Sequence, residues 1–224
     1  MKSEIEAVQD TLLNQKIFLQ NTRLKKKEED GEISYELLLA SAERRPSDTP
    51  ENKVRSETSS VEIQFTYGDH STELQKVVNH IAEATKYSRS ETQTTYLDKN
   101  VHHFRSGNMQ DHIDASIYWV KDKSAPVETC IGFQESYRDP MGLRCEWEGL
   151  VAIQNKSETE TLGLVAERAK DFIRLLPWCQ NDSKAGPGDL GPFENSTFVK
   201  PDFVSLQGME FLRFTIPMPM LNLI

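Results

Sequence analysis

The segment Val127–Gln154, VETCIGFQESYRDPMGLRCEWEGLVAIQ, decides how the rest of the chain is interpreted. It contains two stretches rich in β-branched and aromatic residues, Val127–Tyr137 and Cys145–Gln154. Between them lies Arg138–Arg144, which holds an Asp-Pro dipeptide and a glycine, residues that turns favour because proline fixes φ and glycine accepts positive φ. The pattern predicts an antiparallel pair of strands joined by a turn.

Acidic residues gather along this predicted strand pair. Residues two apart in a strand lie on the same face, so Glu135 and Tyr137 would share a face of the first strand, and Glu146 and Glu148 a face of the second. If the faces coincide, neighbouring carboxylates need a positive partner, because like charges raise each other's pKa. An arginine of the turn or the ammonium of a peptide N-terminus would serve. From the residue pattern alone, a solvated hairpin surface remains the simpler interpretation.

Further elements are predicted on both sides of this segment. Apolar residues at helical spacing predict four helices besides one near the N-terminus, with a capping box of Thr72 and Gln75 opening the first of the four and Ile113 and Ile117 facing inward in the third. The predicted helices cover about 72–87, 92–105, 109–120 and 157–176; the predicted strands cover 17–24, 33–41, 61–65, 203–206 and 209–215; a charged turn covers 25–31, and loops cover 43–60 and 180–196. Separate helices and antiparallel strands indicate the α+β class.

Composition limits the classes of partner. The net charge is −9 at pH 7, and 37% of residues are apolar. An acidic chain does not attract nucleic-acid phosphates, and no run approaches the roughly 18 apolar residues of a membrane-spanning helix. We therefore expect no nucleic-acid and no membrane partner. Three dispersed cysteines and an N-terminus without an apolar segment favour a cytoplasmic protein.

The residue spacing predicts no metal site. Histidine occurs at positions 70, 80, 102, 103 and 112, and no two are four apart, the spacing that a helical zinc site requires. We interpret these histidines as partly exposed helix residues. The sequence also lacks a G-x-S-x-G nucleophile segment and a phosphate-binding P-loop.

Residues 129–149, TCIGFQESYRDPMGLRCEWEG, resemble a segment of the dipeptidyl peptidase III family. The resemblance continues in LQKVVNHIAEA at 74–84, DHIDASIYWVKDK at 111–123 and KPDFVSL at 200–206. It covers most of this chain but only a central slice of a much longer family sequence. The family cleaves dipeptides from the N-termini of short peptides with one zinc ion.

The resemblance implies a fold as well. Family members have a lower lobe built on a β-barrel and a mostly helical upper lobe that holds the zinc. We therefore expect residues 1–155 to form a lower-lobe segment, 156–200 a helical excursion into the upper lobe, and 201–224 the return to the lower lobe.

Three site residues carry over from the family. Glu135 matches the glutamate that binds the free amine of the substrate, and Glu148 matches a further substrate-binding glutamate. Tyr137 matches the catalytic tyrosine that stabilises the oxyanion-like transition state, where the loss of one donor costs about a hundredfold in rate. The implied partners are short peptides with a free N-terminus.

The family's zinc-binding segments, His-Glu-Leu-Leu-Gly-His and Glu-Glu-Cys-Arg-Ala-Glu, do not occur in this sequence. We thus expect zinc to be the cofactor of the intact family and this chain to bind none. The run Ile216-Pro217-Met218-Pro219 departs from the family's Ile-Pro-Ala-Gly segment near the last residue. This predicts a truncated enzyme fragment that is inactive alone. A non-catalytic peptide-binding or regulatory module and an unstable remnant with open strand edges remain as alternatives.

Overall fold

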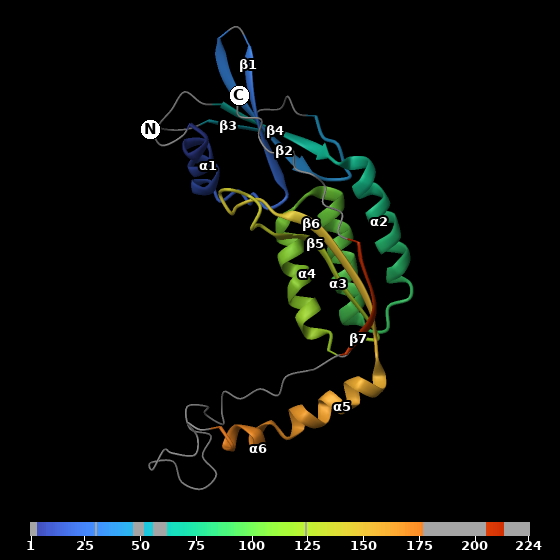
Figure 1. Ribbon diagram of the computed structural model, residues 1–224. Coiled ribbons are helices and arrows are strands. Elements are labelled where there is room, and N and C mark those ends of the chain that lie inside the picture. The colour runs from blue at the N-terminus through green and yellow to red at the C-terminus, as the bar shows by residue number, and fades with distance from the viewer. Residues whose placement is uncertain are drawn as a thin grey trace. The chain divides into compact units, whose positions relative to one another are not determined.

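The protein is described here by a computed structural model, which covers residues 4–29, 31–46, 52–55, 62–123, 125–176 and 205–212 (Figure 1). The chain divides into two compact units, whose described parts are chiefly 4–122 with 130–149 for the first and 125–129 with 150–176 for the second. Helices and strands occur in separate groups, so the predicted α+β class is confirmed. The elements are α1 (Glu4–Asn14), β1 (Thr22–Glu29), β2 (Glu32–Ala40), β3 (Lys53–Arg55), β4 (Glu62–Asp69), α2 (Ser71–Thr85), α3 (Glu91–Ser106), α4 (Met109–Lys121), β5 (Val127–Glu135), β6 (Glu146–Gln154), α5 (Lys156–Glu167), α6 (Ala169–Arg174) and β7 (Leu206–Leu212).

The first unit contains a mixed sheet with the strand order β1-β2-β4-β3. β1 and β2 form the predicted antiparallel hairpin, and β2 pairs with β4 in parallel. The prediction of a long charged turn is wrong, because pairing continues to Glu29 opposite Glu32. The basic run is held in the strand by cross-strand charge, since Lys27 Nζ lies 3.0 Å from a carboxylate oxygen of Glu36.

The segment predicted to be a loop between the hairpin and β4 contains a strand. β3 pairs antiparallel with β4, with Val54 opposite Ile63. A run of three residues among Ser, Thr and Pro carries too little apolar periodicity to be recognised in the sequence. Val61, the predicted first residue of the next strand, lies outside the described residues.

One hydrophobic core lies between α1 and this sheet. Val8 and Leu12 of α1 pack with alternate residues of the strands, among them Leu37 of β2 and Ile63 of β4. Tyr35 is paired with Ile63, and Leu37 with Phe65, so side chains of the same parity point to α1.

A second core lies among the three central helices. α3 packs against both α2 and α4 (Figure 1). The residues that helical spacing predicts to face inward in α2 and α3 are buried, except Val77, which is partly buried. α3 begins at Ser90, whose Oγ accepts a hydrogen bond from Gln93 N at 3.0 Å, and it ends at Gly107 with φ 78°. The buried residues are Leu74, Val78, Ile81, Leu97, Val101 and Phe104.

Two details of these helices differ from the prediction. α2 begins one residue earlier than expected, after His70, whose side chain makes no capping hydrogen bond, so the predicted capping box of Thr72 is wrong. Met109 of α4 is buried, as helical spacing predicts, but Ile113 and Ile117 are exposed and Ala115 is buried in their place. The apolar residues of α4 lie on more than one face of the helix, so their spacing alone does not predict which face is buried.

The predicted pair of strands on either side of the Asp-Pro turn is present as β5 and β6. They are neighbours in a three-stranded sheet with β7. Gln154 N donates to Pro126 O at 3.0 Å, which joins the end of β6 to the start of β5 and makes the pair antiparallel, as predicted. β5 ends at Glu135, two residues earlier than expected. The turn is organised by Asp139, whose carboxylate accepts from Leu143 N at 2.7 Å and from Arg144 N at 3.0 Å.

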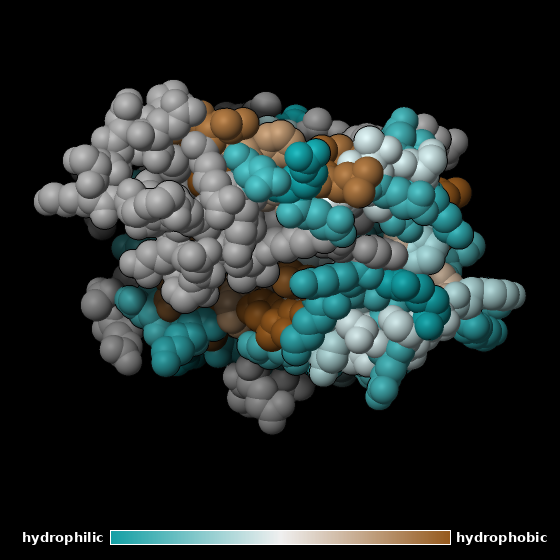
Figure 2. Space-filling view, turned by 90° about the horizontal axis from the view of Figure 1, so that it is seen from below, coloured by the Kyte–Doolittle hydropathy of each residue, from teal (hydrophilic) through white to brown (hydrophobic). Residues whose placement is uncertain are grey.

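The predicted helix 157–176 is divided into α5 and α6 at Arg168. The N-cap is Asn155, whose side chain accepts from Glu158 N, and not Ser157. The apolar face of the two helices is solvent-accessible, with Leu164 61% and Leu175 67% exposed. Grouped apolar side chains also reach the surface in the face that Figure 2 shows.

Some predictions fall outside the described residues. These are the loop 180–196, the strand residue Phe203 and the cysteine at 179. β7 is one strand that covers parts of two predicted ones. None of the helices in the described part of the chain is long and apolar enough to cross a membrane.

Candidate functional site

The predicted acidic residues lie at the ends of β5 and β6 that the loop joins, and one of them forms an ion pair with the loop. Arg138 Nη1 lies 3.0 Å from Glu146 Oε1, and the side chain of Glu146 is only 12% exposed. Arg138 is therefore a positive partner of the kind that the neighbouring carboxylates require.

Arg144, the second arginine of the turn, plays a different part. Its side chain is buried, and its Nε and Nη2 have no hydrogen-bond partner among the described residues. Burial lowers the pKa of its guanidinium, an effect that the charge of Asp139 opposes. A buried cation with open donors attracts an acceptor.

The three predicted site residues lie around this turn. Glu135 is the last residue of β5 and is exposed, Tyr137 is in the turn with 64% of its surface exposed, and Glu148 is half-buried on β6. Because Tyr137 lies beyond the strand, strand alternation does not place it on one face with Glu135, and that step of the prediction is wrong. Glu146 and Glu148 do lie two apart within β6.

Burial and the negative charges around the turn raise the pKa of a neighbouring thiol, that of Cys145. The pKa of Cys145 is raised to about 11, first by burial and then by the negative charges of Asp139 and Glu135. The carboxylate of Glu135 therefore acts on the base of the turn, although it is exposed. At neutral pH the thiol is protonated, so Cys145 is not an activated nucleophile.

The strands behind the turn are fixed by the second core. Phe133 of β5 and Trp147 of β6 both pack on Phe104 of α3, with ring centroids 6.5 and 6.4 Å apart. Cys145 N also donates to Gln20 O at 2.8 Å. Glu135 and Glu148 thus project from strands that this packing holds in place, which favours a defined binding geometry.

The described residues do not form a metal centre. No group of three or more His, Cys, Asp or Glu side chains in the described part of the chain is placed to hold an ion. The strongest donors that come together are His103 and His112, with ring centroids 5.2 Å apart. Two imidazoles without a third ligand do not fit the three or four protein ligands of a zinc site.

The prediction that the histidines are partly exposed helix residues is wrong for His103. It is fully buried, and burial lowers its pKa to about 4, despite the hydrogen bond between Nδ1 and Asn108 O at 2.9 Å. Burial lowers the pKa of His112 as well. A neutral imidazole packed on Phe104 belongs to the core.

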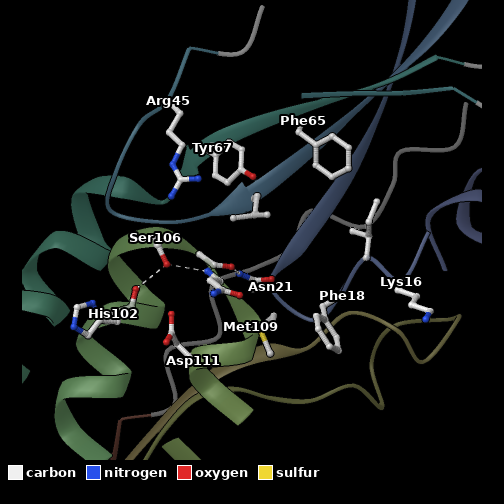
Figure 3. A pocket seen from close by; sticks show the side chains of 14 residues that line it. Lys16, Phe18, Asn21, Arg45, Phe65, Tyr67, His102, Ser106, Met109 and Asp111 are labelled. Atoms are coloured by element: carbon white, nitrogen blue, oxygen red, sulfur yellow. Dashed lines mark hydrogen bonds between the residues drawn. The ribbon is translucent and has the colours of Figure 1, made fainter. Parts of the chain in front are cut away.

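A pocket of about 590 Å³ in the first unit was not predicted from the sequence. It lies between the sheet and the junction of α3 with α4 (Figure 3). Its wall includes Arg45, Tyr67, Asn21 and Asp111, which are far apart in the sequence. No local motif joins these residues, and Asn21, which directly precedes β1, has no sequence signal of its own.

Comparison with known proteins places the chain in a family. The model of peptidase family M49 matches residues 1–221. The chain is similar to dipeptidyl peptidase 3 of Dictyostelium discoideum, with 40% identity over 216 residues that are 96% of this chain and 28% of the relative. Dipeptidyl peptidase 3 of Nematostella vectensis is 37% identical and that of Homo sapiens 34%, each over 96% of this chain. The chain thus spans 28% to 29% of the length of these relatives.

Among solved structures, dipeptidyl peptidase III from Caldithrix abyssi aligns with a TM-score of 0.49 and 13% identity, over 83% of this chain and 31% of the other. The family assignment rests on the sequence matches. The resemblance seen in residues 129–149 is confirmed, and the chain belongs to peptidase family M49.

Proposed function

We propose that this chain supplies the part of a dipeptidyl peptidase III-type exopeptidase that binds the N-terminus of a short peptide. The observation that carries the proposal is the 40% identity with a dipeptidyl peptidase 3 across 96% of this chain, including the whole β5–β6 turn. The acidic turn is suited to a peptide ammonium, because one carboxylate is already neutralised by Arg138 while Glu135 stays exposed.

Each site residue has a role that its chemistry allows. Glu135 accepts hydrogen bonds from the substrate ammonium, an opposite-charge contact that measures the cleavage position from the N-terminus. Glu148 adds a second acceptor along the peptide. Tyr137 donates from its phenol to the carbonyl oxygen of the bond to be cleaved, where negative charge develops in the transition state. The exposure of Tyr137 leaves its ring accessible to a substrate.

Zinc does not fit the described residues, since they hold no three-ligand cluster, and no reaction step is assigned to it in this chain. In the proposed enzyme, zinc belongs to parts of the family fold that this sequence does not match. The residues of this chain bind and orient the peptide and stabilise developing charge, and they do not activate water.

The lobe assignment follows the same proposal. β1 to β6 would form part of the barrel-containing lower lobe, and α5 with α6 would enter the helical upper lobe. The exposed apolar face of α5 and α6 supports this, because apolar helix faces of this kind are normally buried against other elements. Residues from a longer family member would cover it.

A second candidate is a peptide-binding or regulatory module without catalysis. It is favoured by the combination of an exposed acidic turn and the lack of a metal-capable cluster among the described side chains. The intact mass of the endogenous protein, with a peptide map past Thr215, separates the two candidates.

We expect a much larger protein that contains zinc-binding helices and releases dipeptides from short peptides. A protein of 25.6 kDa would contradict the enzyme proposal and favour the module.

A further inference from the structure

The pocket in the first unit carries opposite charges on opposing sides. Arg45 and Tyr67 enter from the side of the sheet, and Asp111 enters from the first turn of α4 (Figure 3). Its volume of about 590 Å³ lies in the range of roughly 300–1,000 Å³ that small-molecule sites occupy. The β5–β6 turn contributes none of its lining residues.

Arg45 is held in position while its donors stay available. Its guanidinium carbon lies 4.5 Å from the centroid of the Tyr67 ring, which orients the planar group. Its ion pair with Glu43 is loose, at 3.8 Å between side chains that are both about half exposed, 44% and 50%. Exposed pairs of this kind contribute little, so a ligand carboxylate that offers two oxygens can replace Glu43.

The helix side of the pocket offers acceptors. Asp111 has one ion pair, with Lys99 Nζ at 3.4 Å, but Lys99 lies closer to Asp114, at 3.1 Å. A ligand cation near Asp111 therefore competes only with the longer of the two ion pairs of Lys99, and Lys99 keeps its ion pair with Asp114. The carboxylate keeps its acceptor capacity for an ammonium.

Asn21 gives the independent sign that a donor is missing. Its side chain is 1% exposed, and its Nδ2 donates to Gly107 O at 2.8 Å, which fixes the orientation of the amide. Its Oδ1 has no hydrogen-bond partner among the described residues. A buried amide oxygen without a donor is unfavourable, so Asn21 adds an unsatisfied polar group to the wall of the pocket.

The remaining wall is mixed: Lys16, His102, Ser106 and Asn108 contribute polar groups, and another part of the wall is apolar. Phe65 of β4, Leu39 of β2 and Met109 of α4 contribute three side chains from three elements. From these observations we propose that the pocket binds a small zwitterion with an apolar side chain, an α-amino acid or a dipeptide. The ligand carboxylate pairs with Arg45, and its ammonium pairs with Asp111.

The test is a titration of ¹⁵N-labelled protein followed by NMR, with L-phenylalanine and Ala-Phe as probes. It is carried out in the Glu135→Gln background, so that binding at the β5–β6 turn does not contribute and failure of either site is recognised separately. N-acetyl-phenylalanine, which lacks the ammonium, and phenylalaninamide, which lacks the carboxylate, are the matched ligands. The readout is the side-chain amide signal of Asn21.

We expect saturable shifts of the Asn21 amide at millimolar probe, and binding at least about tenfold weaker for both capped ligands, the value of one charge-assisted contact. A preference for phenylalanine over Ala-Phe assigns the site to free amino acids, and the reverse assigns it to dipeptides. Arg45→Gln and Asp111→Asn should each weaken binding about tenfold, whereas Arg55→Gln, whose ion pair with Glu62 lies outside the pocket, should not.

Equal affinity of the capped and uncapped ligands, or no shift of the Asn21 signal, would overturn the proposal. The ligand series on the chain with its pocket unchanged decides the matter even if a pocket variant fails to fold.

Discussion

Protonation of one buried histidine should control a large part of the acid sensitivity of the protein. His103 is fully buried, and burial lowers its pKa from 6.5 to about 4. The folded protein therefore binds fewer protons at this site than the unfolded chain does between these two values. The stabilisation is complete above pH 6.5 and is lost as the pH falls toward 4.

The size of the effect follows from the shift. At about 1.4 kcal/mol per pKa unit, lowering the pKa from 6.5 to about 4 corresponds to about 3 kcal/mol of unfolding free energy. That is a large share of the roughly 5–15 kcal/mol by which domains are stable. The neighbouring His112 adds to the loss in the same direction, because burial lowers its pKa also.

The assay is urea unfolding at pH 7.5 and pH 4 for three proteins. His103→Gln removes the buried titrating group, and the adjacent, exposed His102→Gln is the matched control. We expect the difference in unfolding free energy between the two pH values to be smaller by about 3 kcal/mol in His103→Gln. Identical pH dependence in both variants would refute the assignment of a neutral buried imidazole to His103.

Three further outcomes follow from the packing, charge and site. Gly107→Ala should destabilise the protein by about 2–4 kcal/mol in urea unfolding, because a Cβ at φ +78° would lie 2.1 Å from Leu39 Cδ2. Gly31→Ala, whose Cβ would have no atom within 4 Å, should cost only the backbone strain of about 1 kcal/mol. Equal losses of unfolding free energy in the two variants would contradict the steric reasoning. Arg23→Leu should cost about 1–3 kcal/mol by removing two hydrogen bonds to Asp69, one of them 2.7 Å long, and a Tm equal to that of the unsubstituted chain would argue against it. The purified chain with added zinc should release no dipeptides from a short peptide, as measured by mass spectrometry, and detectable release would show that its residues activate water after all.

Elements with strong apolar periodicity could be predicted from the sequence. α3 could be predicted, since Leu97, Val101 and Phe104 repeat at helical spacing before Gly107. The β5–β6 pair was predicted for a similar reason, because alternating apolar residues enclose an Asp-Pro turn. In both cases local chemistry and tertiary packing favour the same structure.

Predictions failed where tertiary contacts override local signals. The charged run of β1 was predicted to be a turn, but Arg23 pairs with Asp69 of β4 and Lys27 with Glu36 of β2. The sequence does not predict that these strands come together. His103 reads as a partly exposed helix residue, and only the packing of α4 and β5 around it makes it a core residue.

The candidate site was only partly accessible to sequence reasoning. The acidic character of the turn follows from strand alternation at Glu146 and Glu148, but the early end of β5 leaves Tyr137 in the turn, which alternation does not reveal. The roles of Glu135, Tyr137 and Glu148 came from the family resemblance and stay proposals. The pocket joins Asn21, Arg45 and Asp111 from three segments, and no local pattern predicts that they meet.

The most direct test of the proposed function measures the affinity of the chain for two versions of one tetrapeptide, with a free or an acetylated N-terminus, by isothermal titration calorimetry. We expect the free amine to bind at least about tenfold more tightly, the value of one charge-assisted contact, and Glu135→Gln to remove this preference while Glu73→Gln on the exposed surface of α2 retains it. Equal affinity for the two peptides, or a preference that survives Glu135→Gln, would contradict the assignment of the β5–β6 turn as the site that binds the peptide N-terminus.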